Sequence, residues 1–318
     1  MRAFSNASSV VLAGVVLLSA TGCAQLGRVQ AMRAYKAANQ AYTQQQYGEA
    51  AKLYEEAITQ DPELSSVYFY LGNSYDQQYR SSKAGQAEND AFMEKAEKNY
   101  QAAADKLLAS ADAKEKDLGR LSLDYLRALY TDKMNDPAKA EVVVQRMIQL
   151  EPSEPTNYFA LAKIYEDAGA YPEAEQMLVA AREARPTDSR VYTMLAGYYN
   201  RQGEFDKTIA ALEQRASKEP DNPEAHFIIS TYYWDNVRGN FRLRDDEKRE
   251  QVVRGLAAVE KALSIKKDYM DALVYKGLLL RLQANLEKDP AKQQALIKEA
   301  EALQGQAEEV RKKRAAGV

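Results

Sequence analysis

Residue types that carry out chemistry are scarce in this chain. Its 318 residues include one histidine, His226, and one cysteine, Cys23. A lone histidine cannot build a histidine-based metal cluster, and the sequence holds no credible serine–histidine–aspartate set and no glycine-rich phosphate loop. Carboxylate pairs such as Asp245 and Asp246 recur on every predicted helix, as is typical of solvated surfaces. We therefore predict a protein that is not an enzyme and has no catalytic residue, no metal ligand and no cofactor.

The elements that carry these residues follow a period of 34 residues, marked by Pro152, Pro186 and Pro220. Two complete copies of one pattern lie between these prolines. The first copy places Tyr158, Leu161, Ala162 and Tyr165 where the second places Tyr192, Leu195, Ala196 and Tyr199. Such a period predicts stacked pairs of helices, each burying its apolar face against its neighbours. His226 takes the place of the first tyrosine in the next copy, so we expect it to serve packing.

This pattern resembles the tetratricopeptide repeat, with its small and aromatic residues on a first helix, a second helix carrying Ala174 and Leu178, and a closing proline. The resemblance implies an all-α fold, a right-handed superhelical solenoid of antiparallel helix pairs. Its six to seven repeats would span residues 31–282, with insertions near 76–95 and 234–254. Residues 283–318 are expected to form a C-terminal capping helix and a basic tail. Residues 109–119 are interpreted as a charged connector, with continuation of the preceding helix as one option.

The amino terminus carries a targeting pattern. The apolar run from Val10 to Leu18 is shorter than the roughly 20 residues that span a bilayer, so it predicts the apolar part of a secretory signal. Small residues precede Cys23, and this arrangement resembles the lipobox of bacterial lipoproteins. The resemblance implies a signal peptide over 1–22, an acylated Cys23 and a short linker over 23–30. Ala24 in place of an aspartate favours the outer membrane facing the periplasm, and a plain signal peptide with a nearby cysteine is the alternative.

A binding groove is expected on the first helices of the repeats. In the resembling family, their positions 2, 5, 9, 12 and 13 form the concave surface that binds an extended peptide or a partner helix. Here the fifth position is repeatedly aromatic and the ninth twice carries an amide, while cations lie close by. The groove candidates are Tyr35, Asn39, Phe69, Asn73, Phe159, Lys163, Arg190, Arg201 and Phe227. The alternative is that these aromatics simply pack against the neighbouring helix.

A second candidate is the stretch from Trp234 to Arg244, which contains the only tryptophan of the chain. Tryptophan and arginine are enriched among the residues that dominate interface energies. We expect a loop here, and it serves either partner binding or closure of the solenoid. The candidate residues are Trp234, Arg238, Phe241, Arg242 and Arg244.

Composition and charge narrow the class of partner. A net charge of −3 gives no basic face for nucleic acid, and no site for a small-molecule substrate is expected. The sequence therefore predicts a non-catalytic scaffold, held to the membrane through lipid on Cys23, with a protein or peptide partner in the bacterial cell envelope. A cell-wall or glycan-associated factor that recruits peptidoglycan enzymes is the alternative. The basic run Arg311 to Arg314 either caps the last helix or contacts anionic lipid or the wall.

Overall fold

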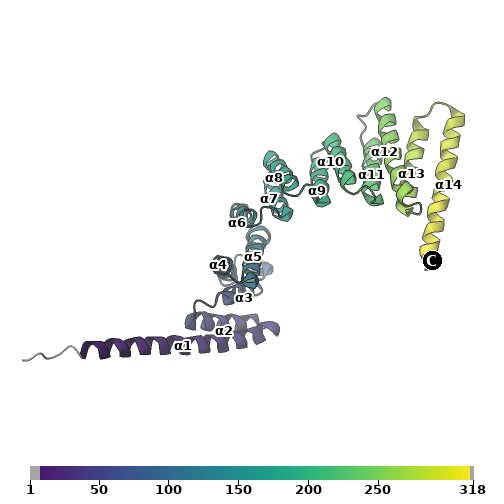
Figure 1. Cartoon of the computed structure of the whole chain (residues 1–318). Coiled ribbons are helices and arrows are strands. Elements are labelled where there is room, and N and C mark those ends of the chain that lie inside the picture. The colour runs from purple at the N-terminus through teal and green to yellow at the C-terminus, as the bar shows by residue number, and fades with distance from the viewer. Residues whose placement is uncertain (1–7, 316–318) are drawn as a thin grey trace, which may run out of the picture. The chain divides into compact units, whose positions relative to one another are not determined.

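The computed structural model describes residues 8–315, and side chains from residue 25 onward. Helices make up most of this part, and it contains no strand (Figure 1). The described residues form two units, one ending at Glu151 and one beginning at Pro152. The all-α prediction is confirmed.

The first unit contains three helix pairs. They are α1 (Ser8–Thr43) with α2 (Tyr47–Gln60), α3 (Ser65–Asp76) with α4 (Ala87–Leu108), and α5 (Ala113–Ala128) with α6 (Pro137–Leu150). A short 3₁₀ turn (Ser81–Lys83) precedes α4, and a π-helical turn (Leu129–Met134) prolongs α5.

The second unit contains four pairs. They are α7 (Pro155–Asp167) with α8 (Tyr171–Ala184), α9 (Ser189–Arg201) with α10 (Phe205–Lys218), α11 (Pro223–Gly239) with α12 (Asp245–Ile265), and α13 (Met270–Leu286) with α14 (Pro290–Ala315). Together the two units hold seven helix pairs within the described residues, and the last pair is completed by α14 in the segment that was expected to form a capping helix.

Helix starts follow from residues that satisfy the unpaired backbone N–H groups of a first turn. Six residues at helix starts accept a backbone N–H through the side chain: Asp112, Asp136, Glu154, Asp188, Asn222 and Asp289. The turns inside the two regular repeats use Gly169 at φ 75° and Gly203 at φ 73°, a conformation that disfavours any residue with a Cβ atom. Capping residues and turn glycines therefore recur with the same 34-residue period as the apolar residues.

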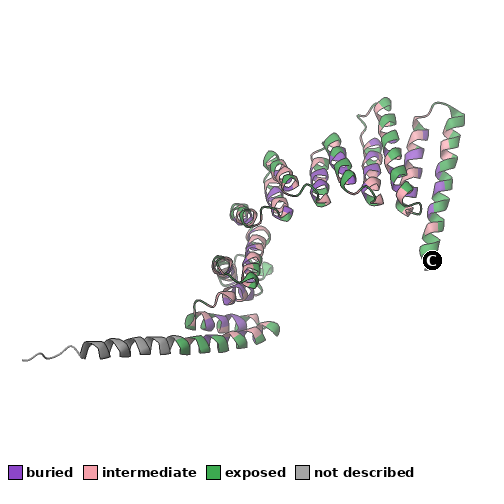
Figure 2. Cartoon of the chain, viewed as in Figure 1, coloured by how far each residue is buried: buried purple, intermediate pink, exposed green. Residues whose placement is uncertain are grey.

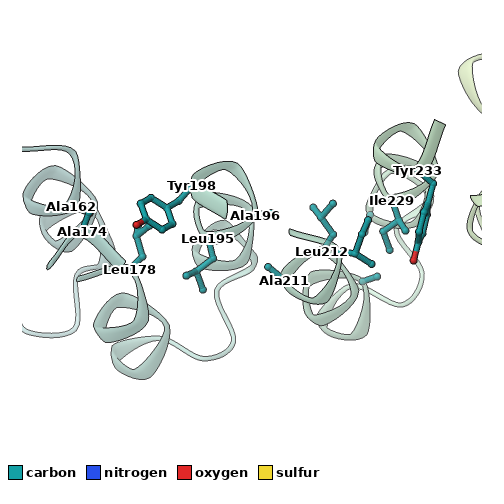
Figure 3. Packing of buried hydrophobic residues seen from close by; sticks show 13 residues of the cluster. Ala162, Ala174, Leu178, Leu195, Ala196, Tyr198, Ala211, Leu212, Ile229 and Tyr233 are labelled. Atoms are coloured by element: carbon teal, nitrogen blue, oxygen red, sulfur yellow. The ribbon is translucent and has the colours of Figure 1, made fainter. Parts of the chain in front are cut away.

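The core of the second unit lies between consecutive helices (Figure 3). Ala162 on α7 and Ala174 on α8 are buried at the small-residue positions, so the two helices approach closely, and Leu178 and Leu195 fill the space beside them. Thr208 replaces the expected alanine on α10. It is fully buried and its hydroxyl donates to the Glu204 carbonyl at 3.0 Å, so the departure from the pattern leaves no unpaired polar atom.

Two expectations about the irregular segments need correction. Residues 109–119 do not continue α4, because α4 ends at Leu108 and Asp112 caps a new helix; most of the stretch is the first turns of α5. The stretch expected as a loop from Trp234 is helical as far as Gly239, which leaves only residues 240–244 between α11 and α12.

The predicted signal peptide (1–22) and the acylated Cys23 lie outside the residues whose side chains the structure describes, and they remain predictions. Across the described residues, we find no helix with the length and apolar character needed to cross a membrane.

Candidate partner-binding surface

The aromatic residues at the fifth position of the first helices pack against the first helix of the next repeat. Tyr35 lies 6.4 Å from Tyr70 between ring centroids, and Phe69 lies 5.4 Å from Tyr125 at an interplanar angle of 90°. Phe227 meets Tyr275 in the same way, at 5.3 Å and 87°. Edge-to-face contacts of this kind are favourable beyond the area they bury. The packing alternative therefore accounts for part of the aromatic pattern.

These aromatics differ in what they leave open to solvent. Phe69 is only 5 % exposed, so it is not available to a partner in this conformation. Tyr35, Phe159 and Phe227 are half-buried. Phe159 packs against the cluster of Ala181, Val191 and Tyr192. A partner could reach the outer edges of these three rings but not that of Phe69.

The two asparagines at the ninth position bind tyrosines of their own repeat or of the preceding one. Asn39 accepts a hydrogen bond from the Tyr54 hydroxyl at 2.7 Å. Asn73, which is 3 % exposed, accepts from Tyr42 at 2.7 Å and donates to the Tyr100 hydroxyl at 3.2 Å. The Asn73 amide is thus used inside the fold.

The predicted cations of the groove are all paired. Arg201 on α9 binds Glu166 on α7 through two bonds of 2.7 and 2.9 Å, a fork that joins successive repeats. Lys163 pairs with Asp167 on its own helix, and Arg190 pairs with Asp188, which caps the same helix. No free cluster of cations is formed by these three side chains, so they offer no clamp for a terminal carboxylate.

The structure brings two separately predicted candidates together on α11 and α13. Trp234 lies 5.5 Å from Tyr275 between ring centroids, and Tyr275 is also the partner of Phe227. Tyr269 lies 5.1 Å from Phe227 on the other side. The Arg238 guanidinium sits over the Trp234 ring at 4.7 Å. We call Phe227, Trp234, Arg238, Tyr269 and Tyr275 the aromatic cluster; its four rings are half-buried and Arg238 is exposed.

The link that follows α11 is the most exposed part of this region. Phe241 is 91 % exposed, and Arg242 is exposed beside it. Arg244 directly precedes α12: its backbone N–H donates to Glu247 at 2.8 Å, and its guanidinium pairs with Asp246 at 3.1 Å and Glu247 at 3.4 Å. Phe241 and Arg242 are therefore available for contact, whereas Arg244 already has a structural role.

Sequence reasoning missed Tyr269 and Tyr275. A signal for Tyr275 exists, since Tyr70, Tyr125 and Tyr275 all occupy the sixth position of the repeat pattern and each meets an aromatic residue of the preceding repeat. Burial raises the pKa of the Tyr275 hydroxyl, and the nearby Asp235 carboxylate adds to the effect. Tyr275 consequently stays neutral at physiological pH and can donate a hydrogen bond to a partner.

The described residues contain no group of three or more potential metal ligands, and the single histidine has a structural role. His226 Nε2 lies 3.0 Å from the Pro220 carbonyl oxygen, and Tyr158 and Tyr192 donate to the carbonyls of Pro152 and Pro186 from the same position. Since a carbonyl can only accept, His226 carries a proton on Nε2 and replaces tyrosine in a bond that ties each repeat to the proline before it.

Comparison with known proteins agrees with this architecture. Residues 35–117 and residues 133–198 each match a family model of the tetratricopeptide repeat. No curated protein matches the sequence.

Solved structures with related folds share little sequence identity with the chain. The C-terminal part of a TPR repeat-containing protein from Cytophaga hutchinsonii is 16 % identical; the match covers 87 % of this chain and 98 % of that chain, with a TM-score of 0.53. A tetratricopeptide repeat protein from Parabacteroides merdae is 14 % identical over 85 % of this chain and 98 % of that chain, with a TM-score of 0.43. YrrB, described as a TPR protein with an unusual peptide-binding site, is 17 % identical over 61 % and 89 %, with a TM-score of 0.39. At these identities the likeness concerns the fold.

Proposed function

Starting from the fact that the chain is a tetratricopeptide repeat protein, we propose that it is a non-catalytic scaffold held at the bacterial cell envelope by lipid on Cys23. Repeats of this kind bind protein or peptide partners. The partner is a protein of the envelope, and it docks on the aromatic cluster and on the link from Asn240 to Arg244.

The observation that carries the docking site is the combination of residues at the end of α11. Trp234 and Arg238 belong to the residue types that dominate interface energies, and here they are stacked on each other at 4.7 Å. The Trp234 ring is held against Tyr275, so little freedom of this side chain is lost when a partner binds. Phe241 adds an apolar side chain that has no cover within the described chain.

The anchor rests on the sequence alone. An apolar run too short to span a bilayer, small residues before Cys23 and the absence of any other cysteine fit acylation of that residue. Intact mass of the protein extracted from membranes tests this step. A mature chain that begins at an acylated Cys23 is expected, and a secreted chain with a free thiol would exclude the anchor.

In-cell photo-cross-linking tests the docking site. A photo-reactive residue in place of Phe241 is expected to capture a defined envelope protein, because that position is 91 % exposed and the replacement leaves the core untouched. The control is Val142 on α6, which is also exposed, at 67 %, and is far from α11 in the sequence.

A matched substitution sharpens the result. Arg242→Glu reverses an exposed charge beside Phe241 and is expected to reduce the captured partner without changing helix content. Equal capture at positions 241 and 142 would exclude the site. If the purified chain sediments with peptidoglycan and captures no protein, the proposed function changes from a protein scaffold to a wall-associated factor.

A further inference from the structure

One side of α1 is apolar and uncovered. Leu26, Val29 and Met32 are 60 %, 50 % and 49 % exposed, so three large apolar side chains gather within seven residues of one helix. Figure 2 shows this part of α1 mostly in the colour of exposed residues. Isolated exposed apolar residues need no explanation, but a stripe on one helix face is typical of a contact surface.

The opposite side of α1 is already used by its own repeat. Ala31, Ala34 and Ala38 are buried on that side, towards α2. Gly27 allows the backbones to approach, because a Cβ atom there would lie 3.1 Å from the Gln60 carbonyl oxygen at the end of α2. The exposed stripe is therefore held on a rigid hairpin and cannot turn inward without breaking it.

The charges around the stripe all have one sign. Arg28, Arg33 and Lys36 are exposed on the same stretch of α1. The first acidic residue of the whole sequence is Glu49, so the chain before it carries cations alone. Of these three cations only Arg28 has an acidic partner among the described residues, Asp61, and that contact is long, at 3.7 Å, with the Arg28 side chain 80 % exposed. An apolar stripe accompanied by cations fits the surface of a membrane, where acyl chains lie beneath anionic headgroups.

We propose that Leu26, Val29 and Met32 insert into the headgroup region of a membrane containing anionic lipid, while Arg28, Arg33 and Lys36 bind its phosphates. This inference rests on the proposed anchor, since Leu26 follows Cys23 by three residues. With a rise of about 1.5 Å per residue, the stretch from Leu26 to Lys36 measures roughly 15 Å, so all six side chains reach the headgroups only if α1 lies along the membrane. The lipid then fixes the orientation of the first hairpin as well as its position.

The test uses the full acylated chain in vesicles. Val29→Cys introduces the only free thiol when Cys23 is a thioether, and it is labelled with an environment-sensitive fluorophore. Val142→Cys on α6 is the control, because that side chain is also exposed, at 67 %, but lies outside the stripe. Vesicles of phosphatidylglycerol with phosphatidylethanolamine are compared with neutral phosphatidylcholine.

The label at position 29 is expected to shift to shorter wavelength and to be quenched by lipid-borne quenchers in the anionic vesicles, and the label at position 142 is not. Arg28→Gln with Arg33→Gln and Lys36→Gln should lower the ratio of inserted to free label by about 125-fold, because each of the three cations contributes about fivefold near an anionic surface. All three side chains are exposed, so this variant should keep its helix content.

Three results overturn the proposal. The first is a label at position 29 that stays in water in both kinds of vesicle although mass spectrometry shows acylated Cys23. The anchor then stands, and the proposed contact of the stripe with the membrane fails. The second is a label that becomes buried in detergent solution as the protein concentration rises. The stripe then binds a second copy of the chain. The third is a Cys23 that is found without lipid, in which case the anchor and this inference fail together.

Discussion

Replacing Asn73 by alanine distinguishes a structural amide from a partner-binding one. Asn73 is 3 % exposed, accepts from Tyr42 at 2.7 Å and donates to Tyr100 at 3.2 Å. The substitution removes both bonds and leaves the fully buried Tyr100 hydroxyl with only a 3.4 Å contact to Asp76. Each lost bond costs about 1 kcal/mol, and an unsatisfied buried hydroxyl adds about 1 kcal/mol or more. We expect a loss of about 3 kcal/mol.

Hydrogen exchange read by mass spectrometry measures this loss where it occurs. Since solenoid repeats interact chiefly with their neighbours, protection should fall about 100-fold in α3 and α4 and stay unchanged in α9 and α10. Asn39→Ala is the matched control: the residue occupies the same position one repeat earlier, is half-buried and makes one bond to a tyrosine, so about 1 kcal/mol is expected. If Asn73→Ala leaves exchange unchanged and abolishes capture of a partner, the amide serves the groove and our reasoning is wrong.

Three further predictions concern residues whose surroundings are equally defined. Burial and a hydrogen bond to Glu175 raise the pKa of Tyr199 to about 12, so its contribution to stability is complete below pH 10 and is lost as the pH rises through about 12. An absorbance titration should show this tyrosine ionising at higher pH in the folded chain than in denaturant. The Arg190 guanidinium lowers the pKa of Asp188 in the folded chain. The ionised Asp188 therefore contributes to stability above about pH 4, and this contribution is lost as the pH falls through the lowered pKa. Asp188→Asn should make the melting temperature depend less on pH in the acid range. Gly72→Ala places a Cβ atom 2.9 Å from Tyr100 and should cost about 1–3 kcal/mol, whereas Gly305→Ala on α14 meets nothing within 4 Å and should stabilise by about 1 kcal/mol in urea unfolding.

The fold could be predicted because its determinants are local. The 34-residue spacing of Pro152, Pro186 and Pro220 coincides with caps such as Asp188 and turns such as Gly203, and each of these acts within a few residues of the chain. Caps, turns and apolar positions then agree on the same helix boundaries, which is what specifies one structure. Seven helix pairs follow from that agreement.

The binding surface could not be predicted in the same way, because its residues depend on partners in other repeats. Phe69 is buried among the rings of Tyr70, Tyr100 and Tyr125, the last of which lies 56 residues later and beyond an insertion that breaks the period. Phe159 has Met194 in the place that corresponds to Tyr125, and it stays half-buried. The same residue type at the same position is thus core in one repeat and partly surface in another.

The additional residues of the irregular repeats show where a fixed period misleads. A repeat with extra residues was expected to hold them in a loop, but the chain between Tyr233 and Arg238 contains no glycine or proline, and a helix gains one hydrogen bond for each residue that prolongs it. The helix α11 accordingly has 17 residues where α7 and α9 have 13, and the difference amounts to roughly 6 Å of added length. Trp234 therefore stays on the helix face beside Tyr275, and only the short link with Phe241 is left as a loop. An insertion that lengthens a helix keeps its side chains in register with the neighbouring repeat, and this register is what joins Trp234 to Phe227 in one site.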